Sequence, residues 1–149
     1  MGRIKRYCRG EDCLNTMRAL QALGVRIDEA DDELCVHGKG LWGLSEPAGV
    51  LDCGNSGTGI RLLTGPLAGQ DFFSVLTGDG SIRRRPMGRF AKPLREMGAT
   101  IAGRKGGELA PLVEKGTTLS AITYTSPVPS AQIKSALLFA ALFANGTSH

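Results

Sequence analysis

Residues that could bind an anion gather at the start of a predicted helix, in the stretch "LDCGNSGTGIRLLTG" at 51–65. Ser56 or Thr58 can cap this helix by accepting a hydrogen bond from an N–H group of its first turn. The free amides of a helix N-terminus also attract anions, and Arg61 follows one turn later. The stretch lacks the lysine of a P-loop and the glycine order of a dinucleotide-binding fingerprint. Its residues therefore allow either a plain helix cap or an anion site.

Arginines surround a second predicted helix start, in "GDGSIRRRPMGR" at 78–89. The arginines are Arg83, Arg84, Arg85 and Arg89. Pro86 is expected at the first helical position, where its missing N–H has no partner to lose. Guanidinium groups bind carboxylates and phosphates through paired hydrogen bonds, so the segment could capture an acidic ligand. A solvated basic loop and a nucleic-acid contact are the alternatives, and no interleaved aromatic residues favour the second.

A third predicted helix begins in "PSAQIKSALLFAAL" at 129–142. Ser130 is a good N-cap, and Gln132 and Lys134 project from the first turn. Taken alone, these residues fit the cap and surface of an ordinary core helix. Three helix starts with anion-binding chemistry in one chain instead favour a ligand that carries more than one acidic group.

Composition limits the class of protein. The chain has 149 residues, of which 42% are hydrophobic and 21% charged, as in a soluble globular domain. No apolar run reaches the roughly 18 residues of a membrane span, so a cytoplasmic location without a membrane partner is expected. The net charge of +4 suits an anionic small molecule, whereas the 5% aromatic content argues against nucleic acid. The cysteines and histidines lack the usual spacing of metal ligands, so no metal site is expected.

Two segments of the chain have similar sequences. The segments "ALQALGVRI" at 19–27 and "PLREMGATI" at 93–101 share one pattern and lie about 75 positions apart. The chain is therefore predicted to hold about two copies of one unit, dividing near residues 75–80, with helices packed against mixed α/β sheets. The predicted helices span residues 14–23, 58–68, 90–97 and 131–144, and the predicted strands span 25–27, 34–38, 72–78, 109–114 and 121–126. The acidic segment "DEADDE" at 28–33 is expected to form a solvated turn.

Four strings together resemble the 5-enolpyruvylshikimate-3-phosphate (EPSP) synthase family of enolpyruvyl transferases. They are "RGEDCLNTMRALQALGV", "GNSGTGIRLLTGPLAG", "LTGDGSIRRRPMGRFAKPLREMGATI" and "ITYTSPVPSAQIKSALLFAAL". The resemblance implies an α/β (α+β) fold of repeated βαβαββ units, arranged in the family as an inside-out α/β barrel. Residues 1–149 would form part of the N-terminal domain, so the barrel would be incomplete here.

The resemblance also implies an activity and its site residues. Members of the family transfer the enolpyruvyl group of phosphoenolpyruvate to shikimate 3-phosphate and release phosphate, without a metal or organic cofactor. The positions that match the phosphoenolpyruvate site are Asn55, Gly57, Thr58, Arg85 and Gln132. The positions that match the shikimate 3-phosphate site are Ser130, Ala131 and Gln132. Ser56 and Arg61 match supporting positions.

The resemblance also implies what this chain lacks. The lysine–serine segment that precedes the first helix in the family, and the acidic and basic residues of the other domain, are absent. We therefore expect no catalytic group in this chain and no turnover by the chain alone; the remainder of the enzyme would complete the site. Gly57 would leave room for the inhibitor glyphosate. The alternatives are a non-catalytic binding module for phosphorylated acids, or a fragment of UDP-N-acetylglucosamine enolpyruvyl transferase, which shares the repeat.

Overall fold

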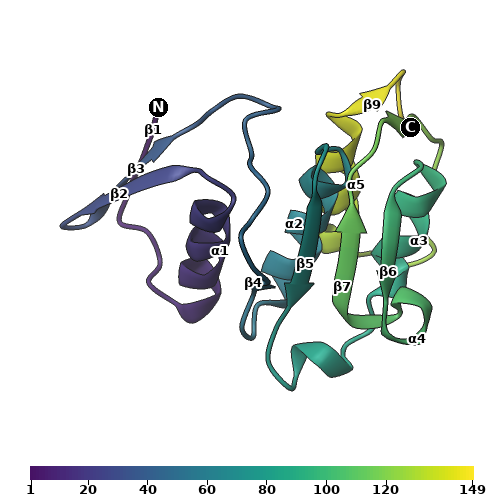
Figure 1. Ribbon diagram of the computed structural model, residues 1–149, viewed down its shortest axis with the longest axis horizontal. Coiled ribbons are helices and arrows are strands. Elements are labelled where there is room, and N and C mark those ends of the chain that lie inside the picture. The colour runs from purple at the N-terminus through teal and green to yellow at the C-terminus, as the bar shows by residue number, and fades with distance from the viewer.

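The computed structural model describes all 149 residues as helices packed against mixed sheets (Figure 1). In chain order the elements are β1 (Gly2–Lys5), α1 (Glu11–Ala22), β2 (Arg26–Ala30), β3 (Glu33–His37), β4 (Leu51–Asp52), α2 (Gly57–Ala68), β5 (Phe73–Thr77), the 3-10 turn η1 (Ile82–Arg84), α3 (Gly88–Glu96), β6 (Thr100–Gly103), α4 (Arg104–Gly107), β7 (Leu109–Lys115), β8 (Leu119–Ser120), α5 (Ala131–Ala141) and β9 (Ala144–Asn145). The mixed α/β class expected from the sequence is confirmed, and no closed barrel forms.

The order of strands is the same in the two halves of the chain. The first sheet runs β1-β3-β2, and the second runs β4-β5-β7-β6, so that β5, β7 and β6 correspond to β1, β3 and β2. Each set of three strands is antiparallel. Along the chain, α1 lies between β1 and β2, and α3 lies between β5 and β6. Strand β4 pairs parallel with β5, and β8 pairs parallel with β9. The second sheet is therefore mixed, and each half contains a short strand, β4 or β8, that is followed in the chain by a helix, α2 or α5.

Helices α2 and α5 form the closest helix pair. A Cβ atom on Gly65 of α2 would collide with the backbone carbonyl of Ala136 in α5, so only glycine permits this approach. Ile60 and Leu67 of α2 are fully buried in the core that these helices share with α3 and the second sheet. Because Thr58 at the start of α2 contacts Gln132 at the start of α5, the N-termini of the two helices lie side by side. The packing thus brings together two of the three predicted helix starts.

Two prolines bear on α3, one before its start and one inside it. Pro86 is not the first helical residue, since α3 begins at Gly88. Arg85 precedes the proline and is extended, with φ −76° and ψ 141°, because the proline ring disfavours a helical conformation at that position. Pro93 lies inside α3, whose nine residues still bury Phe90 and Leu94.

Three other element boundaries also differ from the prediction. The acidic segment 28–33 is mostly strand, because β2 continues to Ala30 and only Asp31 and Asp32 make the turn. Residues 121–126 form no regular strand; they make isolated backbone hydrogen bonds with residues 145–149. Helix α5 ends at Ala141, because Ala144 and Asn145 leave the helix to pair with β8 as strand β9.

Candidate functional site

The start of α2 carries two hydroxyl groups, and only one of them caps the helix. The Ser56 hydroxyl is buried and accepts a 2.9 Å hydrogen bond from the Gly59 N–H, so Ser56 is the N-cap. Thr58 is exposed, and its hydroxyl accepts a 2.9 Å hydrogen bond from Nε2 of Gln132. The cap therefore uses one of the two candidate hydroxyls and leaves the other at the surface of the site.

Arg61 joins the starts of the two helices. Its Nη1 donates to the Gly57 carbonyl at 3.1 Å and to Oε1 of Gln132 at 2.9 Å. Gln132 thus accepts from Arg61 through its oxygen and donates to Thr58 through its nitrogen. With both ends of its amide occupied, the Gln132 side chain is fixed between α2 and α5.

Arg85 approaches the same turn from the segment between η1 and α3. Its Nη2 donates to Oδ1 of Asn55 and to the Ser81 hydroxyl, both at 3.4 Å. A Cβ atom on Gly57 would lie 2.8 Å from Nη1 of Arg61 and 2.8 Å from Nη1 of Arg85. Both guanidinium groups therefore border the space directly above Gly57, which is too narrow for a Cβ atom; we call this space the gap above Gly57.

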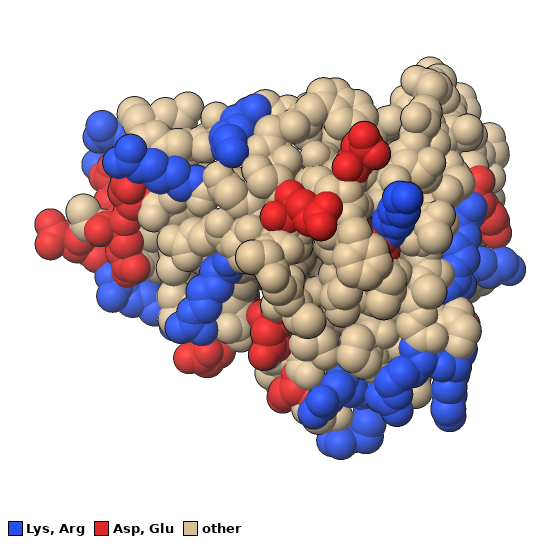
Figure 2. Space-filling view, viewed as in Figure 1, with Lys and Arg blue, Asp and Glu red and all other residues tan.

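Positive charges border this gap, and the Asp79 carboxylate acts on Arg85 without forming an ion pair with it. Burial, together with the positive charges of Arg85 and Arg89, lowers the pKa of Arg61 from its ordinary value. All six ion pairs of the chain join residues between positions 3 and 37, so none neutralises these arginines. Figure 2 shows basic side chains gathered at the lower right, below α3 in the orientation of Figure 1. A bound anion would relieve the repulsion among the guanidinium groups.

The start of α5 contributes Ser130 and Ala131. The Ser130 hydroxyl accepts from the Ile133 N–H at 3.4 Å, which confirms the predicted N-cap, and Ala131 is exposed beside it. A pocket of about 600 Å³ opens next to Ser130, but it is mostly apolar and includes neither Arg61 nor Arg85. Ser130 and Lys134 line this pocket, whereas the guanidinium groups of Arg61 and Arg85 lie outside it, at the gap above Gly57.

Two polar residues near the gap, Asp79 and Asn15, are not among the site residues predicted from the sequence. Asp79 accepts a 2.6 Å hydrogen bond from Nδ2 of Asn55, and Asn15 of α1 lies against Gly54. An aspartate that precedes a turn is a known capping signal, and it could have identified Asp79. No local pattern could have identified Asn15, because its contact with Gly54 depends on how α1 packs.

Neither a metal-binding cluster of side chains nor a membrane-spanning helix is found in the structure. No three or more histidine, cysteine, aspartate or glutamate side chains come together as a set that could hold a metal ion. None of the helices has the length and hydrophobicity that crossing a membrane requires.

Comparisons of the sequence and of the structure with known proteins all identify the same family. The family model of EPSP synthase (3-phosphoshikimate 1-carboxyvinyltransferase) matches residues 2–149. A 3-phosphoshikimate 1-carboxyvinyltransferase from Pelobacter propionicus is 60% identical over 143 residues, which cover 96% of this chain and 33% of that protein. One from Alkaliphilus metalliredigens is 56% identical over 144 residues, covering 97% and 34%. The solved EPSP synthase from Acinetobacter baumannii matches with a TM-score of 0.93 and 44% identity, over 97% of this chain and 33% of that one. The chain thus spans about a third of the length of these relatives.

Proposed function

We propose, because the chain belongs to the EPSP synthase family, that it forms one wall of a site that binds phosphoenolpyruvate and shikimate 3-phosphate. The complete protein would transfer the enolpyruvyl group to the 5-hydroxyl of shikimate 3-phosphate and release phosphate. The observation that carries this proposal is the gap above Gly57, where Arg61 and Arg85 approach the same glycine and neither forms an ion pair. Both substrates carry phosphate and carboxylate groups, which guanidinium groups bind well.

The phosphoenolpyruvate subsite is assigned to the turn and the two arginines. Asn55, Gly57, Thr58, Arg85 and Gln132 would hold this substrate, with Ser56 and Arg61 in supporting positions. The N-terminus of α2 adds a partial positive charge at the same place. Glyphosate, an anionic inhibitor of the family, would compete for this subsite.

The shikimate 3-phosphate subsite is assigned to the start of α5. Ser130, Ala131 and Gln132 would line it, and Gln132 would face both substrates because it lies between the two helix starts. The α5 N-terminus again offers free backbone N–H groups to a phosphate. The two substrates would therefore meet where α2 and α5 begin.

The proton transfers are assigned to residues outside this chain. No carboxylate or lysine lies among the hydrogen-bonded groups of the gap other than Asp79, which accepts hydrogen bonds from its own loop and from Asn55. We therefore propose that the remainder of the protein supplies the acid and base groups. The division of the chain into two repeat units near residues 75–80, and its cytoplasmic location, belong to the same proposal.

Phosphate release tests the proposed function. The full-length protein should release phosphate when it is given both substrates, and the 149-residue chain alone should not. In the full-length protein, Arg85→Ala should raise the KM for phosphoenolpyruvate at least tenfold, because it removes a charged contact. Arg84→Ala is the matched control, since it removes an equal charge from an exposed neighbouring residue.

Each result of this experiment has a distinct meaning. If the full-length protein binds both substrates by calorimetry without releasing phosphate, the chain belongs to a binding module and the transferase function is wrong. If Arg84→Ala and Arg85→Ala weaken phosphoenolpyruvate equally, the site assignment is wrong, because only general charge matters. Turnover by the 149-residue chain would contradict the assignment of the proton transfers.

A further inference from the structure

Asp79 connects the turn before α2 with the segment that carries Arg85. One carboxylate oxygen, Oδ1, accepts 2.8 Å hydrogen bonds from the N–H groups of Ser81 and Ile82. The other, Oδ2, accepts a 2.6 Å hydrogen bond from Nδ2 of Asn55. The Asp79 backbone N–H also donates to the Gly54 carbonyl at 2.8 Å. A single side chain therefore fixes two loops that are separated by 24 positions in the sequence.

The polarity of these hydrogen bonds fixes the orientation of the Asn55 amide. A carboxylate only accepts hydrogen bonds, so the Asn55 nitrogen must face Asp79. The Asn55 oxygen then faces Nη2 of Arg85, at 3.4 Å. Without Asp79 the amide could turn over and present its own N–H groups to the guanidinium, which has no acceptor to offer.

We infer that Asp79 is a positioning residue: by orienting the Asn55 amide, it holds the Arg85 guanidinium in place for an acidic group of phosphoenolpyruvate. The inference rests on the proposed function of the gap above Gly57. It deepens that function by assigning part of the phosphoenolpyruvate affinity to a residue that does not touch the substrate.

The ionisation of Asp79 agrees with this role. Hydrogen bonds from the Ile82 N–H and from Asn55 hold the pKa of Asp79 below its ordinary value. Asp79 is therefore a carboxylate at neutral pH and can only accept. The negative charge of Asp79 would by itself disfavour a nearby anion. Two explanations of Asp79 therefore predict opposite changes in phosphoenolpyruvate affinity when the residue is replaced. Loss of a merely unfavourable charge strengthens phosphoenolpyruvate binding, and loss of the positioning contact weakens it.

The decisive variant is Asp79→Asn in the full-length protein. Asparagine keeps an oxygen for the N–H groups of Ser81 and Ile82, because it is also a good N-cap. Its nitrogen, however, replaces Oδ2 and faces the Asn55 nitrogen, so that two donors meet. We expect the KM for phosphoenolpyruvate to rise about tenfold, as for the loss of one hydrogen bond to a charged group. We expect the KM for shikimate 3-phosphate and the Tm to stay at their wild-type values.

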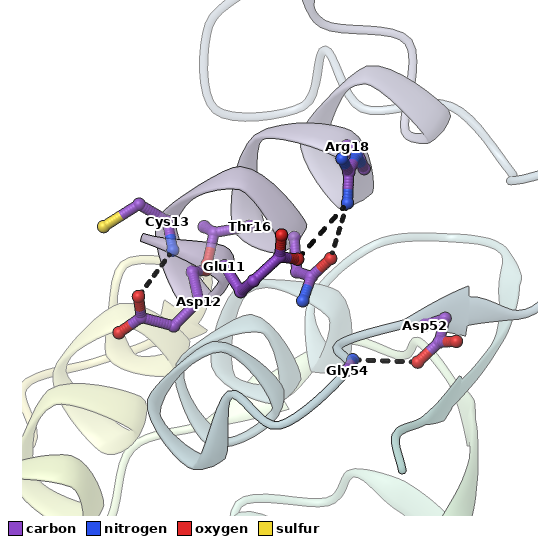
Figure 3. Close-up of polar contacts among 8 residues, drawn as sticks. Glu11, Asp12, Cys13, Thr16, Arg18, Asp52 and Gly54 are labelled. Atoms are coloured by element: carbon purple, nitrogen blue, oxygen red, sulfur yellow. Dashed lines mark hydrogen bonds and ion pairs between the residues drawn. The ribbon is translucent and has the colours of Figure 1, made fainter. Parts of the chain in front are cut away.

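Asp52→Asn provides the matched control. Oδ1 of Asp52 accepts a 2.8 Å hydrogen bond from the Gly54 N–H, where β4 enters the turn before α2 (Figure 3). This variant removes one negative charge at the end of β4, beside the turn that holds Asn55, without altering a contact of Asn55. It should leave the KM for phosphoenolpyruvate unchanged or lower it slightly. A rise with Asp79→Asn and none with Asp52→Asn therefore identifies orientation, and not charge, as the cause.

A second variant covers the case in which Asp79→Asn lowers the Tm. Asp79→Ser keeps an N-cap oxygen, but its shorter side chain cannot reach Asn55, so the same rise in the KM for phosphoenolpyruvate is expected. The inference is wrong if the folded variant leaves that KM unchanged or lowers it, or if the KM values for both substrates rise together. A wild-type protein that binds no phosphoenolpyruvate would instead contradict the proposed function on which the inference rests.

Discussion

The guanidinium of Arg61 donates a 2.9 Å hydrogen bond to Oε1 of Gln132, although the two residues lie 71 positions apart. This contact joins the first turns of α2 and α5, which belong to different halves of the chain. It exists because Gly65 lets the two helices approach within backbone contact. The groups proposed to bind an anion are thus brought together by helix packing and not by one continuous loop.

Gln132→Glu tests whether the positive charge of Arg61 is needed at the site. The new carboxylate would accept from Arg61 at the position of Oε1 and form an ion pair, which neutralises the guanidinium. We expect the KM for phosphoenolpyruvate in the full-length protein to rise more than tenfold, by repulsion of the anionic substrate. Gln132→Met is the control, because it removes the amide without adding charge and should have a smaller effect. Equal effects of the two variants would contradict a role for the charge of Arg61.

Gly57→Ala tests the space above the turn. The added methyl group would lie 2.8 Å from a nitrogen of both Arg61 and Arg85, so at least one guanidinium must move. In the full-length protein we expect the glyphosate concentration for half-inhibition to rise at least tenfold, with a smaller rise in the KM for phosphoenolpyruvate. Gly49→Ala is a suitable control, since its Cβ would meet nothing within 4 Å. Unchanged inhibition by glyphosate in Gly57→Ala would show that the inhibitor does not occupy this gap.

The limits of α2 could be predicted from the sequence because their causes are local. A glycine-rich turn and a serine cap precede the first apolar turn of α2, and the structure places the N-cap at Ser56 as one of the two predicted candidates. The contact of Arg61 with Gln132 could not be predicted, because it depends on the close approach at Gly65, which only the packed structure reveals. The family resemblance, and not local chemistry, named Gln132 as a residue that faces both substrates.

Other differences arise where tertiary contacts overcome local preference. Residues 121–126 contain β-branched and aromatic side chains that favour a strand. Their hydrogen bonds go instead to residues 145–149 in an irregular pattern. The end of α5 was likewise placed too late, because Ala144 pairs with Leu119 of β8. In both cases the local sequence does not identify the distant residues with which the segment forms hydrogen bonds.

Ser56→Ala tests the N-cap of α2. The Ser56 hydroxyl is 4% exposed and accepts a 2.9 Å hydrogen bond, so its removal leaves the Gly59 N–H without a partner. We expect the free energy of unfolding to fall by about 1 kcal/mol, measured by urea denaturation. Ser130→Ala should cost less, because the Ser130 cap of α5 is longer, at 3.4 Å, and only half-buried. A larger loss from Ser130→Ala would contradict this ranking of the two caps.

Glu114→Gln tests a carboxyl group that the proposed function does not use. Glu114 lies on β7, in register with Ser74 and Ile101, and both of its carboxyl oxygens are buried without a hydrogen-bond partner. Burial raises the pKa of Glu114 well above its ordinary value. The folded state therefore binds the proton more tightly than the unfolded state. The resulting stabilisation is complete below the unfolded pKa and is lost as the pH rises toward the folded pKa.

The pH dependence of unfolding separates this effect from packing. Between pH 5 and 8, the free energy of unfolding of the wild type should fall relative to that of Glu114→Gln, by up to about 1.4 kcal/mol per pH unit while only the folded state stays protonated. Glu96→Gln, which removes an exposed carboxylate, should instead follow the wild-type curve. Urea denaturation at several pH values measures the difference. Parallel curves for Glu114→Gln and the wild type would mean that Glu114 ionises alike in the folded and unfolded states, contrary to its burial.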